Sequence, residues 1–187
     1  MSKTQAIACV ALLRGINVGK AKRIAMADLR EILSDTLGFT EVRTLLNSGN
    51  ALFKATPSQL SGAAAAIAAA IEHRCGFSVA VIVVSASELH EVIAQNSLLQ
   101  RQADPSQLLV AFLASAQTQA KAQALLQQDW GDEAFALGER AAYLHCASGV
   151  IDSKLAKDFA RATGEAATSR NWHTVLKLQA MLEGHAD

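Results

Sequence analysis

The sequence lacks an excess of charge of either sign, and it has few aromatic residues. Seventeen Lys and Arg residues balance seventeen Asp and Glu residues, and aromatic residues make up 5% of the 187 residues. A neutral chain has no long-range field to draw it onto nucleic acid or an anionic membrane. The small basic cluster of Lys20, Lys22 and Arg23 has no interleaved aromatic residues for base stacking, so we interpret it as a solvated surface. Nucleic acid is therefore not a favoured partner.

Cysteine is scarce, and its number is odd. Cys9, Cys75 and Cys146 cannot all pair within the chain, and each lies in or beside an apolar segment, as a small core residue does. His73 and His145 lie near two of these cysteines, but no second pair has the spacing of a metal site. We therefore expect a reducing compartment and no metal.

Long hydrophobic runs are also missing. The apolar stretch Ala6–Leu13 is too short to span a membrane, and no small-residue cleavage site accompanies it. We expect a cytoplasmic protein that does not bind a membrane. Hydrophobic residues still make up 51% of the chain, which is ample for a core in one domain or in two small ones.

The first half of the chain predicts the order strand, helix, strand, strand, helix, strand. The apolar run that opens it is typical of a buried strand, and Asn47-Ser48-Gly49 can adopt the positive φ of a tight hairpin turn. The predicted strands cover Ala6–Leu13, Glu41–Leu46, Asn50–Lys54 and Ser78–Val84, and the predicted helices cover Met26–Leu37 and Ala63–Ile71.

The second half repeats that order after a helix over Ala86–Ala94 and a polar connector. Its strands are predicted over Leu108–Leu113, Ala134–Leu137, Ala141–Cys146 and Ala166–Ser169, and its helices over Ala116–Gln127, Ser153–Ala162 and Asn171–Leu182. We predict an α+β protein of two ferredoxin-like (βαββαβ) units, each an antiparallel sheet with helices on one face, plus a C-terminal helix. The expected boundaries are 1–84 for the first unit, 85–107 for the linking helix and connector, and 108–187 for the second unit.

Two polar motifs are expected to converge in the first unit. Its third strand should lie between the first and second strands and run antiparallel to both, so the loop after the first strand and the hairpin turn fall at one end of the sheet. Donors there would suit a carboxylate, a phosphate or a polar peptide backbone. The alternative is that Asn and Gly only shape two turns while Arg14 caps carbonyl groups. The candidate ligand-binding residues are Arg14, Gly15, Asn17, Gly19, Lys20, Asn47, Ser48, Gly49 and Asn50.

A third polar patch is predicted at the start of the last helix. The topology puts it at the opposite end of its own sheet from the position equivalent to Arg14. The same motif can be explained without a ligand. Trp172 would then be a core anchor, Asn171 a helix cap and Arg170 a surface contact. The candidates are Arg170, Asn171 and His173, with Lys154 and Lys157 on a neighbouring element.

No motif names a reaction. The segment from Gly15 to Lys20 has too few residues for a phosphate-binding P-loop, and Ala21 stands where that loop has Ser or Thr. We interpret Asp129, Asp132 and Glu133 as a solvated turn rather than an acid-base pair. No nucleophile with a base can be identified, so an enzyme of this sequence would depend on a cofactor or a second substrate for its reactive group, and the sequence does not say which.

Four ordered motifs resemble a known family. The segments Val10–Gly19, Met26–Arg30, Leu46–Asn50 and Thr168–Trp172 are similar to those of the domain of unknown function 1697 family, which consists of uncharacterised bacterial proteins. The resemblance spans nearly the whole chain and implies two ferredoxin-like units, but it implies no reaction. This chain departs from the usual pattern at Lys20, where a second glycine is common, and at His173, where asparagine is common.

The molecular function is therefore open between three classes. The preferred hypothesis is binding of a small anionic ligand or a polar peptide at the loop and hairpin-turn end of the first unit. The second is an enzyme of unknown reaction that uses Arg14, Asn17 and Arg170 as anion clamps. The third is an interaction module, either a homodimer or a nucleic-acid binder. The sequence does not determine the oligomeric state.

Overall fold

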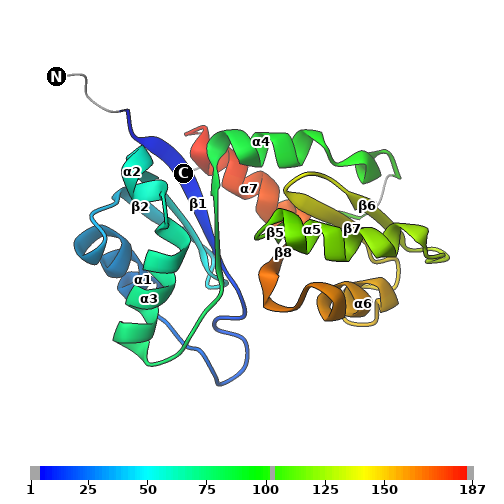
Figure 1. Cartoon of the computed structure of the whole chain (residues 1–187), viewed down its shortest axis with the longest axis horizontal. Coiled ribbons are helices and arrows are strands. Elements are labelled where there is room, and N and C mark those ends of the chain that lie inside the picture. Colours follow the sequence, from blue (N-terminus) through cyan, green and yellow to red (C-terminus); the bar gives the residue numbers. More distant parts are fainter. Residues whose placement is uncertain (1–4, 102–103, 185–187) are drawn as a thin grey trace. The chain divides into compact units, whose positions relative to one another are not determined.

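Two four-stranded antiparallel sheets organise the chain (Figure 1). The structure is a computed structural model that describes residues 5–101 and 104–184. The chain divides into two units after Ala86, and the described C-terminal residues from Met181 onward belong to the first unit. Helix α4 (Ala86–Ala94), which we expected as a linking segment, lies almost wholly in the second unit. In the part of the chain that the structure describes, no helix is both long and apolar enough to cross a membrane.

The first unit has the predicted ferredoxin-like topology. Its strand order is β2-β3-β1-β4, and each neighbouring pair is antiparallel. The third strand thus lies between the first and the second, as predicted. The elements are β1 (Ile7–Leu13), α1 (Met26–Glu31), η1 (Ile32–Thr36), β2 (Thr40–Leu45), β3 (Asn50–Ala55), α2 (Pro57–Leu60), α3 (Ala63–Cys75) and β4 (Val81–Ser85).

The core of the first unit lies between one face of this sheet and helices α1 and α3. Cys9, Ala11 and Leu13 alternate along β1 and pack into one cluster with Leu29 of α1 and Ile67 of α3. Alternate residues of a strand share one face, so these positions form the helix-covered side of the sheet. Ala8, Val10 and Leu12, which face the other side of the sheet, are apolar as well. The sequence of β1 is therefore an unbroken hydrophobic run.

The second unit repeats the topology with the strand order β6-β7-β5-β8, as predicted. It opens with α4 and a 3-10 turn, η2 (Ser97–Arg101), and its core lies between the sheet and helices α5 and α6. The further elements are β5 (Leu108–Leu113), α5 (Ala116–Gln123), η3 (Ala124–Gln127), β6 (Ala134–Leu137), β7 (Ala141–His145), α6 (Lys154–Thr163), η4 (Gly164–Ala166), β8 (Ala167–Asn171) and α7 (Trp172–Leu182).

Two helices of the first unit differ from the predicted ones. The helix predicted over Met26–Leu37 widens into a π-helix after Glu31, and the Leu37 amide donates to the Ile32 carbonyl at 3.1 Å. Ile32 and Leu33, at the start of this wider turn, are both buried. Ahead of the alanine-rich helix, Gly62 at φ +86° separates α3 from the short helix α2.

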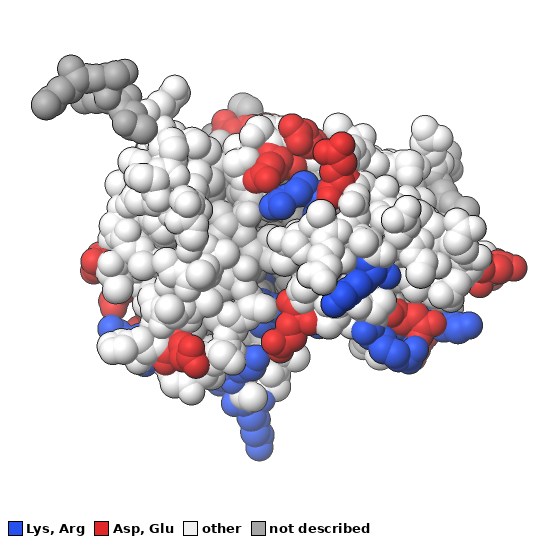
Figure 2. All heavy atoms as spheres, in the orientation of Figure 1, with Lys and Arg blue, Asp and Glu red and all other residues white. Residues whose placement is uncertain are grey.

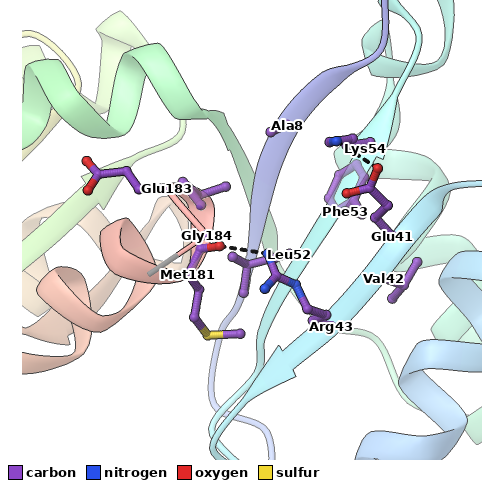
Figure 3. Close-up of a pocket in the computed structure, with 11 residues that line it drawn as sticks. Ala8, Glu41, Val42, Arg43, Leu52, Phe53, Lys54, Met181, Glu183 and Gly184 are labelled. Carbon is purple, nitrogen blue, oxygen red and sulfur yellow. Dashed lines mark hydrogen bonds and ion pairs between the residues drawn. The ribbon is translucent and has the colours of Figure 1, made fainter. Parts of the chain in front are cut away.

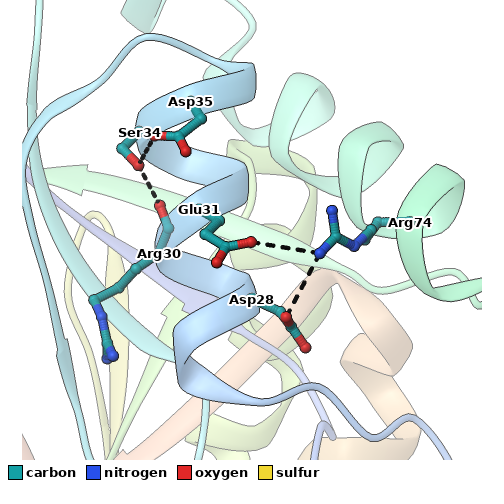
Figure 4. A network of polar contacts seen from close by, with 6 residues as sticks. All are labelled: Asp28, Arg30, Glu31, Ser34, Asp35 and Arg74. Carbon is teal, nitrogen blue, oxygen red and sulfur yellow. Dashed lines mark hydrogen bonds and ion pairs between the residues drawn. The ribbon is translucent and has the colours of Figure 1, made fainter.

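An exposed ion-pair network joins α1 to α3 (Figure 4). The guanidinium of Arg74 lies 3.6 Å from the Asp28 carboxylate and 3.4 Å from the Glu31 carboxylate. Because all three side chains are about half exposed, each pair stabilises the fold by only about 0 to 1 kcal/mol. The apolar contacts beneath the network therefore dominate the packing of these helices.

A buried tyrosine hydroxyl connects α4 to the second sheet. The hydroxyl of Tyr143 on β7 donates to the Val92 carbonyl at 2.6 Å, and the side chain is fully buried. Burial disfavours the phenolate and raises the pKa of Tyr143 to about 12. Deprotonation would both bury a charge and remove the only hydrogen donor of this contact.

The second unit should therefore lose stability at high pH. Because the folded pKa of Tyr143 lies above the ordinary value of 10, its contribution is complete below pH 10 and is lost as the pH rises towards about 12. Tyr143 is the single tyrosine of the chain. Absorbance at 295 nm should follow its titration, and we expect phenolate to form only together with loss of near-ultraviolet circular dichroism. A tyrosine that ionises near pH 10 in the folded protein would contradict this prediction.

Candidate functional site

The loop after β1 and the turn between β2 and β3 meet at one end of the first sheet, as the topology predicted. Leu12 of β1 lies opposite Asn50 of β3, so the end of one strand is beside the start of the other. The amide of Leu13 donates to the Gly49 carbonyl at 2.8 Å. The two motifs are therefore parts of one structure, although about thirty-five residues separate them along the chain.

Gly49 sits where no side chain fits. Its φ is +80°, and a Cβ atom there would lie 2.8 Å from Leu13 Cβ and 2.9 Å from Ile16 Cγ1. Ile16 is buried although it belongs to the loop. The turn therefore rests directly on a loop side chain, and only glycine permits both the approach and the backbone conformation.

Asn17 fastens the loop to itself and to the turn. Its Nδ2 donates to the Ile24 carbonyl at 2.9 Å and to the Asn47 carbonyl at 2.8 Å. Its Oδ1 accepts from the Ile24 amide at 3.0 Å, and its own amide donates to the Lys22 carbonyl at 3.0 Å. The side-chain amide has both donors engaged, so Asn17 acts here as a structural clamp.

Asn50 and Ser48 shape the turn in a similar way. Asn50 is fully buried, and its Nδ2 donates to the Leu45 carbonyl at 3.1 Å and to Ser48 Oγ at 3.0 Å. Buried amides need such partners because an unsatisfied donor costs about 1–3 kcal/mol. The turn-shaping alternative thus accounts for Asn17, Gly49 and Asn50. Their contact with a ligand remains a prediction.

The backbone of this region is strained. Among the described residues, four non-glycine residues have positive φ, and three of them, Asn17, Lys22 and Leu46, lie in the loop or the turn. Gly15 and Gly19 add two further positive φ values to the loop. Strain of this kind persists only where surrounding contacts determine the conformation, and it concentrates at functional sites.

The outer surface of the loop is basic and partly apolar. Within the described residues, Lys20, Lys22 and Arg23 have no ion pair, and Arg23 Nη2 donates to the Gly19 carbonyl at 2.8 Å. Val18 is 74% exposed and Leu46 is 55% exposed. In Figure 2, basic side chains project from the edge of the first unit where Figure 1 draws this loop. We name Val18, Lys20, Lys22, Arg23 and Leu46 the loop surface.

The second unit has no such loop. Its strand β5 ends with the same hydrogen bonds as β1: the Leu113 amide donates to the Arg140 carbonyl at 2.9 Å, and the Ala114 amide donates to the Ala166 carbonyl at 2.9 Å. Residues 114 and 115 alone then lead into α5, and Ser115 Oγ caps it by accepting from the Thr118 amide. In the first unit, the corresponding connection from β1 to α1 consists of residues 14–25.

The third predicted patch lies at the end of the second sheet where β5 begins, as predicted. Arg170 pairs with Val110 and Asn171 with Leu109, both near the start of β5. Asn171 Oδ1 accepts from the Thr174 amide at 2.8 Å and caps α7.

Trp172 is buried and His173 is exposed on the first turn of α7. Arg170 Nη1 donates to Thr168 Oγ1 at 3.0 Å and to the Ser169 carbonyl at 2.8 Å. Burial lowers the pKa of Arg170 to about 10. The motif therefore combines a helix cap, a core anchor and a partly buried guanidinium.

The acidic segment of the second unit is more structural than a solvated turn. Glu133 Oε2 accepts from the Leu155 amide at 3.0 Å, so this carboxylate caps the start of α6 together with Ser153. Lys154 Nζ lies 5.9 Å from the centre of the Trp130 ring. Among the described residues, no group of three or more His, Cys, Asp or Glu side chains is placed to hold a metal ion.

The sequence did not indicate Val18 or Leu46 as candidates, and it favoured a solvated surface for Lys22 and Arg23. Val18 could have been found from the sequence, because it is an apolar residue among glycines and lysines. The segment around it is too polar to form part of the core, so an exposed apolar side chain was to be expected there.

Fold and loop together define a class: two ferredoxin-like units, of which the first carries an elaborated loop. The chain belongs to the family described as "Protein of unknown function (DUF1697)", whose model matches residues 7–143. A solved structure of the conserved bacterial protein SP0830 from Streptococcus pneumoniae is similar, with a TM-score of 0.72 and 20% sequence identity. The similarity covers 95% of this chain and 99% of that one, and it concerns the fold alone. No curated protein matches the chain.

Substitution of Gly49 by Ala should destabilise the first unit by about 2–4 kcal/mol, because overpacking adds to the left-handed backbone penalty. The free energy of unfolding in urea measures this loss. Gly19→Ala is the matched control, since Gly19 has φ +67° but nothing within 4 Å of its Cβ position. Equal losses for both variants would show that the contact of the turn with Leu13 and Ile16 does not matter.

Asn17→Asp should loosen the loop from the turn. Aspartate keeps the size and tolerates positive φ, but it cannot donate to the Ile24 and Asn47 carbonyls, so we expect a loss of about 1–3 kcal/mol. Hydrogen exchange at residues 17–24 should accelerate in the variant. Asn47→Asp is the control, because Asn47 contributes its backbone carbonyl to this contact and its side chain is exposed. Unchanged exchange in Asn17→Asp would contradict the clamp.

Proposed function

We propose that this protein binds an acidic peptide segment through the loop surface of its first unit. The observation that carries the proposal is the difference between the two units. They share their topology and their strand-end hydrogen bonds, yet residues 14–25 stand in the first unit where the second has only residues 114 and 115. Loops that a rigid scaffold holds in a strained conformation are common places for binding.

The chemistry of the loop surface favours a partner that is both acidic and partly apolar. Three cations that have no carboxylate partner among the described residues supply charge complementarity, which gives specificity and faster association. Val18 and Leu46 would bury apolar area that a free inorganic anion could not cover. An acidic peptide segment with apolar side chains satisfies both requirements, and a small anion satisfies only the first.

The rigidity of the loop is a third argument for peptide binding. The Asn17 clamp and the Gly49 contact order the loop before any partner arrives, so binding need not supply the entropy of ordering it. The enzyme hypothesis gains less from this arrangement. Asn17 would have to break its bonds to Ile24 and Asn47 before it could clamp an anion.

Binding can be measured by fluorescence anisotropy with a labelled peptide of alternating glutamate and leucine. Charge reversal by Lys20→Glu, Lys22→Glu and Arg23→Glu together should weaken binding at least tenfold, because attraction becomes repulsion. Val18→Ser should weaken it about two- to tenfold through lost apolar burial. Affinity should also fall with rising salt, as expected for exposed charges.

The matched control reverses three exposed lysines of the second unit, Lys121→Glu, Lys157→Glu and Lys177→Glu, and so changes the net charge by the same amount. Equal weakening by both triple variants would show that only the overall charge matters. Full competition by inorganic phosphate would indicate a small-anion site instead. No binding of the peptide by the unaltered protein would refute the proposal.

A further inference from the structure

A cavity lies in the first unit on the face of the sheet opposite to α1 and α3 (Figure 3). Its volume is about 600 Å³, within the usual range of small-molecule sites. Ala8 pairs with Lys54, and Leu52 pairs with Arg43, which sets these four side chains on one face. The end of α7 and the two residues after it, 181–184, line the other side, and all of these residues belong to the first unit.

The rim of the cavity contains a strained bulge. The pairing of β2 with β3 shifts between Thr40 and Arg43, so Glu41 and Val42 together oppose Phe53. Glu41 has φ +51° and is the fourth described non-glycine residue with positive φ. Bulges redirect side chains and are frequent beside binding sites. Here the bulge places the Glu41 carboxylate 2.7 Å from Lys54 Nζ.

The charges around the cavity do not all cancel. Lys54 and Glu41 neutralise each other, whereas Arg43 Nη2 donates to the uncharged Met181 carbonyl at 2.7 Å. Over residues 5–101 and 104–184, Arg43 has no ion pair with a carboxylate. The Glu183 side chain points away from Arg43 in Figure 3. One guanidinium charge therefore remains beside an apolar floor made by Ala8 and Leu52.

We propose that this cavity binds a small amphipathic carboxylate. The carboxylate pairs with the free edge of the Arg43 guanidinium, whose planar fork suits two parallel hydrogen bonds. The apolar body lies along Ala8, Leu52 and Met181. The site is separate from the loop surface, so it does not rest on peptide binding.

A purely structural role of Arg43 makes a different prediction. The guanidinium would then only hold the last turn of α7 through the Met181 carbonyl, and its removal would lower stability without affecting any ligand. A binding measurement separates the two roles, because the occupied cavity adds a ligand-dependent signal.

The experiment is an NMR titration of the full chain with sodium octanoate. We expect saturable shifts of backbone amides at 41–43, 52–54 and 181–184. Octan-1-ol, which has the same apolar body and no charge, should bind at least tenfold more weakly. Arg43→Met keeps the length of the side chain and removes the charge, and it should weaken octanoate binding at least tenfold.

Two further variants keep the test decisive. Ala8→Leu fills the floor without changing any charge and should also weaken octanoate binding, even if Arg43→Met disturbs the helix end. Arg30→Met is the matched control, since Arg30 donates to Thr44 of the same strand β2 but does not line the cavity. Absence of saturable shifts, or octanoate binding that neither Arg43→Met nor Ala8→Leu weakens, would overturn the proposal. Competition by the acidic peptide would also contradict a separate site.

Discussion

The close approach of Gly49 to Leu13 and Ile16 is the contact on which the rest of the first unit's binding end depends. It brings the hairpin turn within reach of Asn17, whose amide then joins turn and loop. Without a left-handed residue that lacks Cβ, the turn would have to move outward and the Asn17 bond would be lost. The polar loop has left-handed backbone at Gly15, Asn17, Gly19 and Lys22 and is thereby fastened to the edge of the sheet. Val18, Lys20 and Arg23 are exposed on it.

The two units share one fold but not the same loops. Both end their first strand with the same pair of backbone hydrogen bonds, and both use the strand order of a ferredoxin-like sheet. They differ in the segment after that strand: Ser115 caps a helix at once in the second unit, whereas the first unit inserts a structured loop. Function is expected where a repeated scaffold departs from its own pattern, because packing alone does not require the added residues.

Much of this could be predicted from the sequence. Hydrophobic periodicity and turn residues indicated every strand that the structure describes, and the topology then placed the loop beside the turn. The role of Asn17 could not be predicted, since it depends on where the Ile24 and Asn47 carbonyls lie after folding. The cavity beside Arg43 was equally inaccessible, because its partner Met181 is 138 residues away along the chain. Local patterns determine which elements form, but the partners of polar side chains depend on tertiary packing.

We expect the loop to be rigid before it meets a partner. Backbone 15N relaxation of the free protein tests this directly over residues 14–24. We predict order parameters of about 0.85, like those of β1, because Asn17, Ile16 and Gly49 hold the loop in place. Order parameters below about 0.6 over these residues would mean a flexible segment, and they would contradict a preformed binding surface.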